Sequence, residues 1–154
     1  MLPKALARAD AFAGRIRDGS WPREELLVAR RIVQELEAYV TFGDSVAALR
    51  QLAHRGVARA AGETIRYLIA DRRARSWRQR VVVAEALRGD EGYDADAYLE
   101  LLARAAETLL APLGVDRAAL LARWKVPPAP ELERYRSPES LAQRRLVSAE
   151  PDRS

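Results

Sequence analysis

The sequence predicts an all-α protein, a compact bundle of about six to seven short-to-medium helices with an irregular proline-rich C-terminal tail. Apolar residues recur at spacings of three and four along most of the chain, which is typical of amphipathic helices. Glycine, aspartate and proline stand where such segments should begin or end. The sequence shows no alternation of apolar and polar residues long enough to predict a strand. The run Val81–Val83 is only three residues long and lies in a helical context. We expect a helical bundle domain over residues 1–126 and a flexible or partner-docked tail over residues 127–154.

The first two helices are predicted before residue 43. An apolar stripe on the first helix, which should stop at Gly19, consists of Leu2, Leu6, Ala9, Ala13 and Ile16. Ser20-Trp21-Pro22 opens the second helix, because proline is tolerated in a first turn. Its stripe, which runs as far as Gly43, consists of Leu26, Ala29, Val33, Leu36 and Val40.

Three helices are predicted between Asp44 and Gly89. Asp44 is a good N-cap for the third helix, which runs to Gly56. The fourth helix starts at Val57 and ends near residues 70–73, because a longer helix would bury Arg72 without a partner. The segment Ser76-Trp77-Arg78-Gln79 is typical of a capping box and opens the fifth helix.

Two further helices complete the predicted bundle. Asp94 is expected to cap the sixth helix, which ends near Pro112, and Asp116 to cap a short seventh helix. The segment 127–130, Pro-Pro-Ala-Pro, stops regular structure. A weak helical patch is expected in the tail over residues 139–147.

The residue inventory excludes several kinds of chemistry. The chain has no cysteine, which excludes disulfide scaffolds, zinc ribbons, iron–sulfur sites and thiolate nucleophiles, and it contains neither a glycine-rich phosphate loop nor a G-x-S-x-G elbow. The single histidine, His54, is expected to interact with the dipole at the end of the third helix. Loop and capping roles are expected for the acidic group of Asp90, Glu91, Asp94 and Asp96. We therefore expect a protein that is not an enzyme, without catalytic residue, cofactor, metal or small-molecule substrate.

The positive charge of the chain is concentrated in one stretch. The formal net charge is +4, and residues 58–88 hold eight arginines against three acidic residues. Five of these arginines surround one tryptophan within residues 72–80, which we call the arginine junction. Arginines beside an aromatic ring can bind phosphates and stack on a base. The candidate contact residues for nucleic acid or a partner are Arg59, Arg66, Arg72, Arg73, Arg75, Trp77, Arg78 and Arg80.

Four of these candidates, Arg59, Arg66, Arg73 and Arg80, are seven residues apart, and the helical prediction places them on an exposed face. Neither Gly56 nor Gly62 fits as the turn glycine of a helix-turn-helix reader, so the expected contact is to the nucleic-acid backbone and not to base edges. Two other interpretations of the arginines remain: pairing with a protein partner or with acids of residues 89–100, and simple solvation.

Two functions are compatible with these features. The first is a small basic helical accessory subunit that contacts nucleic-acid backbone, RNA or DNA, without sequence specificity inside a larger nucleoprotein assembly. By size, helical class and basic patch such a protein is comparable to the small subunits of CRISPR effector complexes, an analogy of class carried by no motif. The alternative is a non-enzymatic protein–protein adaptor whose arginine junction and tail dock on an acidic partner. No membrane association is expected, and a cytoplasmic location is the default expectation.

Overall fold

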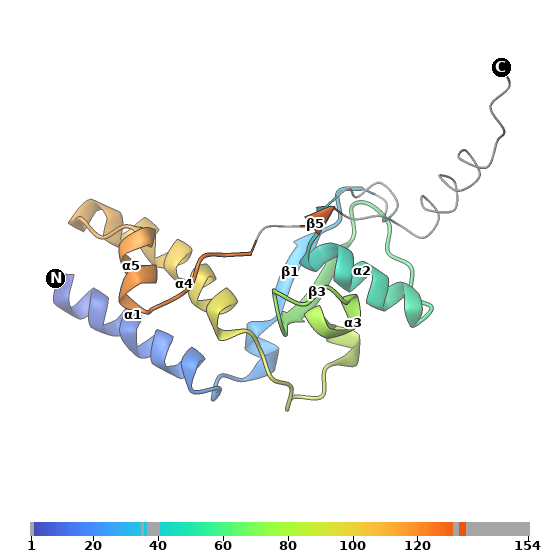
Figure 1. Ribbon diagram of the computed structural model, residues 1–154, viewed down its shortest axis with the longest axis horizontal. Helices are drawn as coiled ribbons and strands as arrows, with labels where there is room; N and C mark the ends of the chain where they lie inside the picture. The colour runs from blue at the N-terminus through green and yellow to red at the C-terminus, as the bar shows by residue number, and fades with distance from the viewer. Residues whose placement is uncertain (1, 35, 37–40, 131–132, 135–154) are drawn as a thin grey trace, which may run out of the picture.

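The chain folds as a mixed helix and sheet protein, so the all-α prediction is wrong. A computed structural model describes residues 2–34, 36, 41–130 and 133–134. At one end of the molecule lie α1 (Leu2–Arg17), α4 (Ala95–Leu110) and α5 (Arg117–Arg123) (Figure 1). At the other end lie an antiparallel sheet, α2 (Asp44–His54) and the short α3 (Trp77–Arg80).

The sheet has three strands in the order β1-β3-β4. The strands are β1 (Val28–Arg31), β3 (Thr64–Ile69) and β4 (Val81–Val83), and α2 packs against β3 and β4. A separate two-stranded ladder pairs β2 (Thr41–Phe42) with β5 (Glu133–Arg134). The short 3-10 helices are η1 (Arg23–Leu26), η3 (Ala84–Ala86) and η4 (Ala111–Leu113).

Three of the predicted helices are wrong because strands replace all or part of them. Over residues 23–31 the predicted second helix is replaced by η1 and β1, while its residues 35 and 37–40 lie outside the described part of the chain. The predicted fourth helix is replaced by β3, and the fifth by α3 followed by β4. Ile65 and Leu68 fit a helical stripe by spacing, but both are buried because β3 is the central strand of the sheet. The segment Thr64–Ile69 is rich in β-branched and aromatic residues, which favour a strand once both faces are covered.

The first, third, sixth and seventh predicted helices are confirmed as α1, α2, α4 and α5. The Asp94 carboxylate accepts the backbone N–H of Ala97 at 3.1 Å, and the Asp116 carboxylate accepts that of Ala119 at 2.8 Å, so both predicted caps are confirmed. The predicted cap of α2 is wrong, because Gly43 occupies the N-cap and the Asp44 carboxylate binds Arg80 instead. The predicted helical patch 139–147 lies outside the described residues.

The larger of two hydrophobic clusters in the described residues joins the two ends of the molecule. The core brings Ile16 of α1 and Leu99 of α4 together with Leu52 of α2 and Leu68 of β3. The buried Tyr98 hydroxyl accepts the backbone N–H of Ile69 at 2.8 Å and donates to the carbonyl of Leu26 at 2.8 Å. Burial raises the pKa of the Tyr98 phenol, which keeps this hydroxyl a donor. None of the described helices has the length and apolar character required to cross a membrane.

Candidate nucleic-acid interface

The eight candidate contact residues do not share one surface. Arg80 is buried: its Nε donates to Asp44 Oδ1 at 2.7 Å, and its Nη1 donates to the carbonyl of Ala74 at 3.2 Å. This ion pair fixes α3 and the start of β4 to the first turn of α2. A buried and paired arginine supports the fold and is not available to a ligand.

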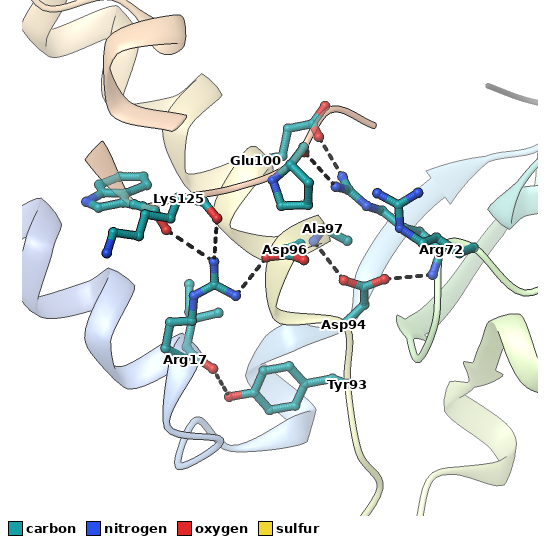
Figure 2. Close-up of polar contacts among 12 residues, drawn as sticks. Arg17, Arg72, Tyr93, Asp94, Asp96, Ala97, Glu100 and Lys125 are labelled. Carbon is teal, nitrogen blue, oxygen red and sulfur yellow. Dashed lines mark hydrogen bonds and ion pairs between the residues drawn. The ribbon is translucent and has the colours of Figure 1, made fainter. Parts of the chain in front are cut away.

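Arg72 is also buried and connects the sheet to α4 (Figure 2). Its Nη1 donates to Glu100 Oε2 at 2.6 Å, its Nη2 donates to the carbonyl of Pro127 at 3.2 Å, and its backbone N–H donates to Asp94 Oδ2 at 2.8 Å. Pairing with an acid of residues 89–100 is therefore observed for Arg72. Arg72 was predicted to be too costly to bury; it is buried because Glu100 supplies the missing charge.

The other candidates outside α3 lie at separate places. Arg59 pairs with Glu85 at 3.2 Å, and Arg66 is exposed on β3. Arg73 is exposed and donates from Nη2 to the carbonyl of Pro128 at 3.2 Å, and Arg75 is exposed. The seven-residue spacing of four arginines therefore produces no common face, because no helix runs from residue 59 to residue 80.

Trp77 and Arg78 lie at a hollow of about 360 Å³, which we call the α2–α3 hollow. Its lining comes from the end of α2, from α3, and from β4 with the segment that follows it. The lining residues are Gln51, His54, Arg55, Trp77, Arg78, Val82, Ala86, Arg88 and Glu91. Its volume lies within the range of small-molecule pockets.

Two aromatic rings and a guanidinium meet in this hollow. The rings of His54 and Trp77 have centroids 5.3 Å apart with an interplanar angle of 52°. The guanidinium carbon of Arg78 lies 4.7 Å from the centroid of the Trp77 ring, a cation–π distance. Trp77 is half-buried, whereas His54 and Arg78 are exposed, so the hollow combines a fixed aromatic platform with accessible polar groups.

Local interactions hold this arrangement in place. Ser76 caps α3 by accepting the backbone N–H of Arg78, which turns the chain into one helical turn at Trp77. Gln51 of α2 bridges β4: its Nε2 donates to the carbonyl of Val81 at 2.9 Å, and its Oε1 accepts the N–H of Val83 at 2.7 Å. These bonds fix the end of α2, and with it His54, beside α3.

The charge of the hollow is positive. Three exposed arginines, Arg55, Arg78 and Arg88, line it with one acidic residue, Glu91. Burial acts to raise the pKa of Glu91, but the backbone N–H groups of Arg88 and Gly89, at 2.7 and 2.6 Å from its carboxylate, outweigh burial and lower it. Glu91 is therefore engaged by its own loop, and the arginines set the charge that a ligand meets.

The prediction of contact residues misses most of the hollow, including its histidine, His54, and two of its arginines, Arg55 and Arg88. His54 ends α2, as expected, but its ring lies against Trp77 as well. Arg55 and Arg88 lie 33 positions apart in sequence, and the packing of α2 on β4 brings both to the hollow. A run of arginines in sequence identifies Arg78, whereas Arg55 and Arg88 stand alone and give no such signal.

The acidic group of residues 90–96 has loop and capping contacts. Asp94 caps α4, the Asp96 carboxylate lies 2.7 Å from Nη1 of Arg17, and Asp90 lies 3.7 Å from Nε of Arg88 (Figure 2 shows the first two). Within the part of the chain that the structure describes, no group of three or more His, Cys, Asp or Glu side chains is arranged to hold a metal ion.

No protein-family model and no curated protein matches this chain. Among solved structures, the chain is similar to a family B DNA polymerase from the hyperthermophilic archaeon Pyrobaculum calidifontis, with a TM-score of 0.51 and 20% sequence identity. The similarity covers 82% of this chain and 15% of the polymerase chain. At this identity the likeness concerns the fold alone.

Proposed function

We propose that this chain is an accessory subunit that contacts nucleic-acid backbone without sequence specificity through the α2–α3 hollow. The observation that carries the proposal is the meeting of Trp77 with three exposed arginines, Arg55, Arg78 and Arg88, in one concave surface. Proteins that bind single strands combine a positive groove for phosphates with aromatic rings on which bases stack. Of the predicted contact residues, Trp77 and Arg78 belong to this surface.

In this proposal the two kinds of side chain have separate roles. An unpaired base stacks on the Trp77 ring and moves Arg78 from the ring to an adjacent phosphate. Arg55 and Arg88 bind flanking phosphates, because both are exposed at the rim of the hollow. Neither role reads the edge of a base, which makes the contact independent of sequence.

The likeness to part of a DNA polymerase concerns the fold alone, so the proposal depends on the hollow itself. The analogy with small helical CRISPR subunits loses its helical class, because the sheet β1-β3-β4 shows that the fold is not all-α. The adaptor alternative stays a prediction. Two arginines of its arginine junction, Arg72 and Arg73, donate hydrogen bonds to the carbonyls of Pro127 and Pro128 within the same chain.

The test is fluorescence anisotropy of labelled single-stranded DNA, single-stranded RNA and duplex with two charge-matched double variants. Arg78→Glu/Arg88→Glu changes the hollow, and Arg104→Glu/Arg117→Glu makes the same charge change at exposed positions of α4 and α5. We expect the first variant to lose single-strand affinity by about a hundredfold and the second by less than about threefold. Equal losses would mean that net charge, and not the hollow, determines binding.

A further inference from the structure

A second surface, the α1–α4 groove, lies on the helical end of the molecule. It has a volume of about 330 Å³, and its lining is apolar apart from Arg8 at the edge. Small side chains form much of the floor, Ala9 of α1 and Ala105 and Ala106 of α4 among them, with Phe12 and Leu109 alongside. Small residues permit another helix to approach the floor closely.

α5 does not cover this groove. It binds α1 at Asp10, whose carboxylate accepts Arg123 Nη2 at 2.7 Å and Trp124 Nε1 at 2.8 Å. Arg8 and Asp10 are two positions apart, so their side chains project about 200° apart around α1. The groove side of α1 therefore faces away from the side that α5 covers.

The groove leaves an apolar side chain in solvent. Leu109, which lines the groove, is 76% exposed, and Leu113 of η4, outside the groove lining, is 47% exposed. Within the described ranges, the exposed large hydrophobic residues are these two and Val33. An apolar patch of this kind is typical of a surface that another molecule covers.

The charge around the groove indicates which molecule would fit. Arg8 lines the groove, and Lys4 and Arg15 are exposed on the same side of α1, four positions before it and seven after it. The guanidinium carbon of Arg15 lies 4.5 Å from the centroid of the Trp21 ring. Where the structure describes the chain, no carboxylate forms an ion pair with Lys4 or Arg8. The three acidic residues of α4 are engaged elsewhere. Asp96 binds Arg17, Glu100 binds Arg72, and Glu107 accepts the backbone N–H of Arg117.

We propose that the α1–α4 groove binds an amphipathic helix of a partner protein, with its apolar face on the alanine floor and a row of acidic residues beside Arg8. Helix-in-groove recognition requires an apolar trough, and the basic edge selects an acidic helix. A second copy of this chain fits less well, because two basic edges would meet. The inference goes beyond nucleic-acid contact and uses a surface separate from the α2–α3 hollow.

The test measures binding of two fluorescein-labelled synthetic peptides to the full chain. Both peptides are amphipathic helices of about five turns with the same leucine face, and one has a row of glutamates where the other has lysines. We expect the glutamate peptide to bind at least about tenfold more tightly. Ala105→Glu, an exposed floor position, should reduce this affinity by about tenfold, and Ala118→Glu on α5, also exposed, should leave it unchanged.

Equal affinity for the two peptides, or equal effects of Ala105→Glu and Ala118→Glu, would overturn the proposal. Dimers in sedimentation that Ala105→Glu dissociates would identify a second copy as the occupant and would also overturn it. Ala105→Glu should bind single-stranded nucleic acid as the unchanged chain does. Failure of one proposal is therefore distinguishable from failure of the other.

Discussion

The ring of Trp77 packs against the ring of His54 with 5.3 Å between their centroids, which joins the first turn of α3 to the end of α2. This contact fixes the orientation of the indole at a concave, arginine-lined surface. An aromatic ring held in this way loses little conformational entropy when a flat ligand stacks on it. The pair therefore provides a stacking platform, and its contribution is separable from that of the surrounding charges.

Replacement of Trp77 tests the stacking role. We expect Trp77→Leu to weaken binding of single-stranded DNA by about tenfold, because stacking on an aromatic ring contributes about 1–3 kcal/mol per base. Trp77→Phe should retain most of the affinity. The slope of log affinity against log salt should be the same in both variants, because no phosphate contact is removed. A slope that falls with Trp77→Leu would assign Trp77 to the positioning of arginines instead.

Arg72 is predicted to stabilise the fold through its ion pair with Glu100. Arg72→Met leaves Glu100 without its partner in a half-buried position, and we expect the free energy of unfolding in urea to fall by about 3 kcal/mol. The neighbouring Arg73→Met, which removes an exposed side chain, should change it by less than about 0.5 kcal/mol. If the two variants unfold at the same urea concentration, the connection between the sheet and α4 through Arg72 is not stabilising.

The contact of Asp10 with α5 predicts a pH dependence of stability. The hydrogen bond from Arg123, opposed by burial and assisted by Trp124, holds the pKa of Asp10 below its usual value of 3.8. A lowered pKa in the folded state adds stability above pH 3.8, and this stability is lost as the pH falls through the folded value. We expect Asp10→Asn to be less stable than the unchanged chain at about pH 6, with the gap smaller at about pH 3. Urea unfolding at the two pH values measures this gap, and an identical gap at both would contradict the prediction.

Two of the helices that could be predicted, α4 and α5, have complete local signals. α4 and α5 each have an apolar stripe and an aspartate whose side chain caps the first turn, Asp94 and Asp116. The strands could not be predicted in this way, because Ile65 and Leu68 satisfy the helical spacing and the burial of a central strand equally well. Tertiary burial, which single-sequence spacing does not contain, decided between the two.

The candidate site was predictable only in part for a similar reason. Trp77 and Arg78 belong to the arginine junction, and both line the hollow. Arg72 and Arg80 belong to the same stretch but are buried, because Glu100 and Asp44, which lie 28 and 36 positions away in sequence, neutralise them. Charge counted along the chain cannot separate a paired arginine from an exposed one.

The salt dependence of single-strand binding tests the central claim most directly. If Arg55, Arg78 and Arg88 each bind a phosphate, log affinity should fall with log salt with a slope of about −2, since each contact to a single strand contributes about −0.7. Arg78→Glu/Arg88→Glu should reduce the slope to about −0.7, and Arg104→Glu/Arg117→Glu should leave it near −2. A slope near zero for the unchanged chain, or the same slope in both double variants, would contradict backbone contact at the α2–α3 hollow.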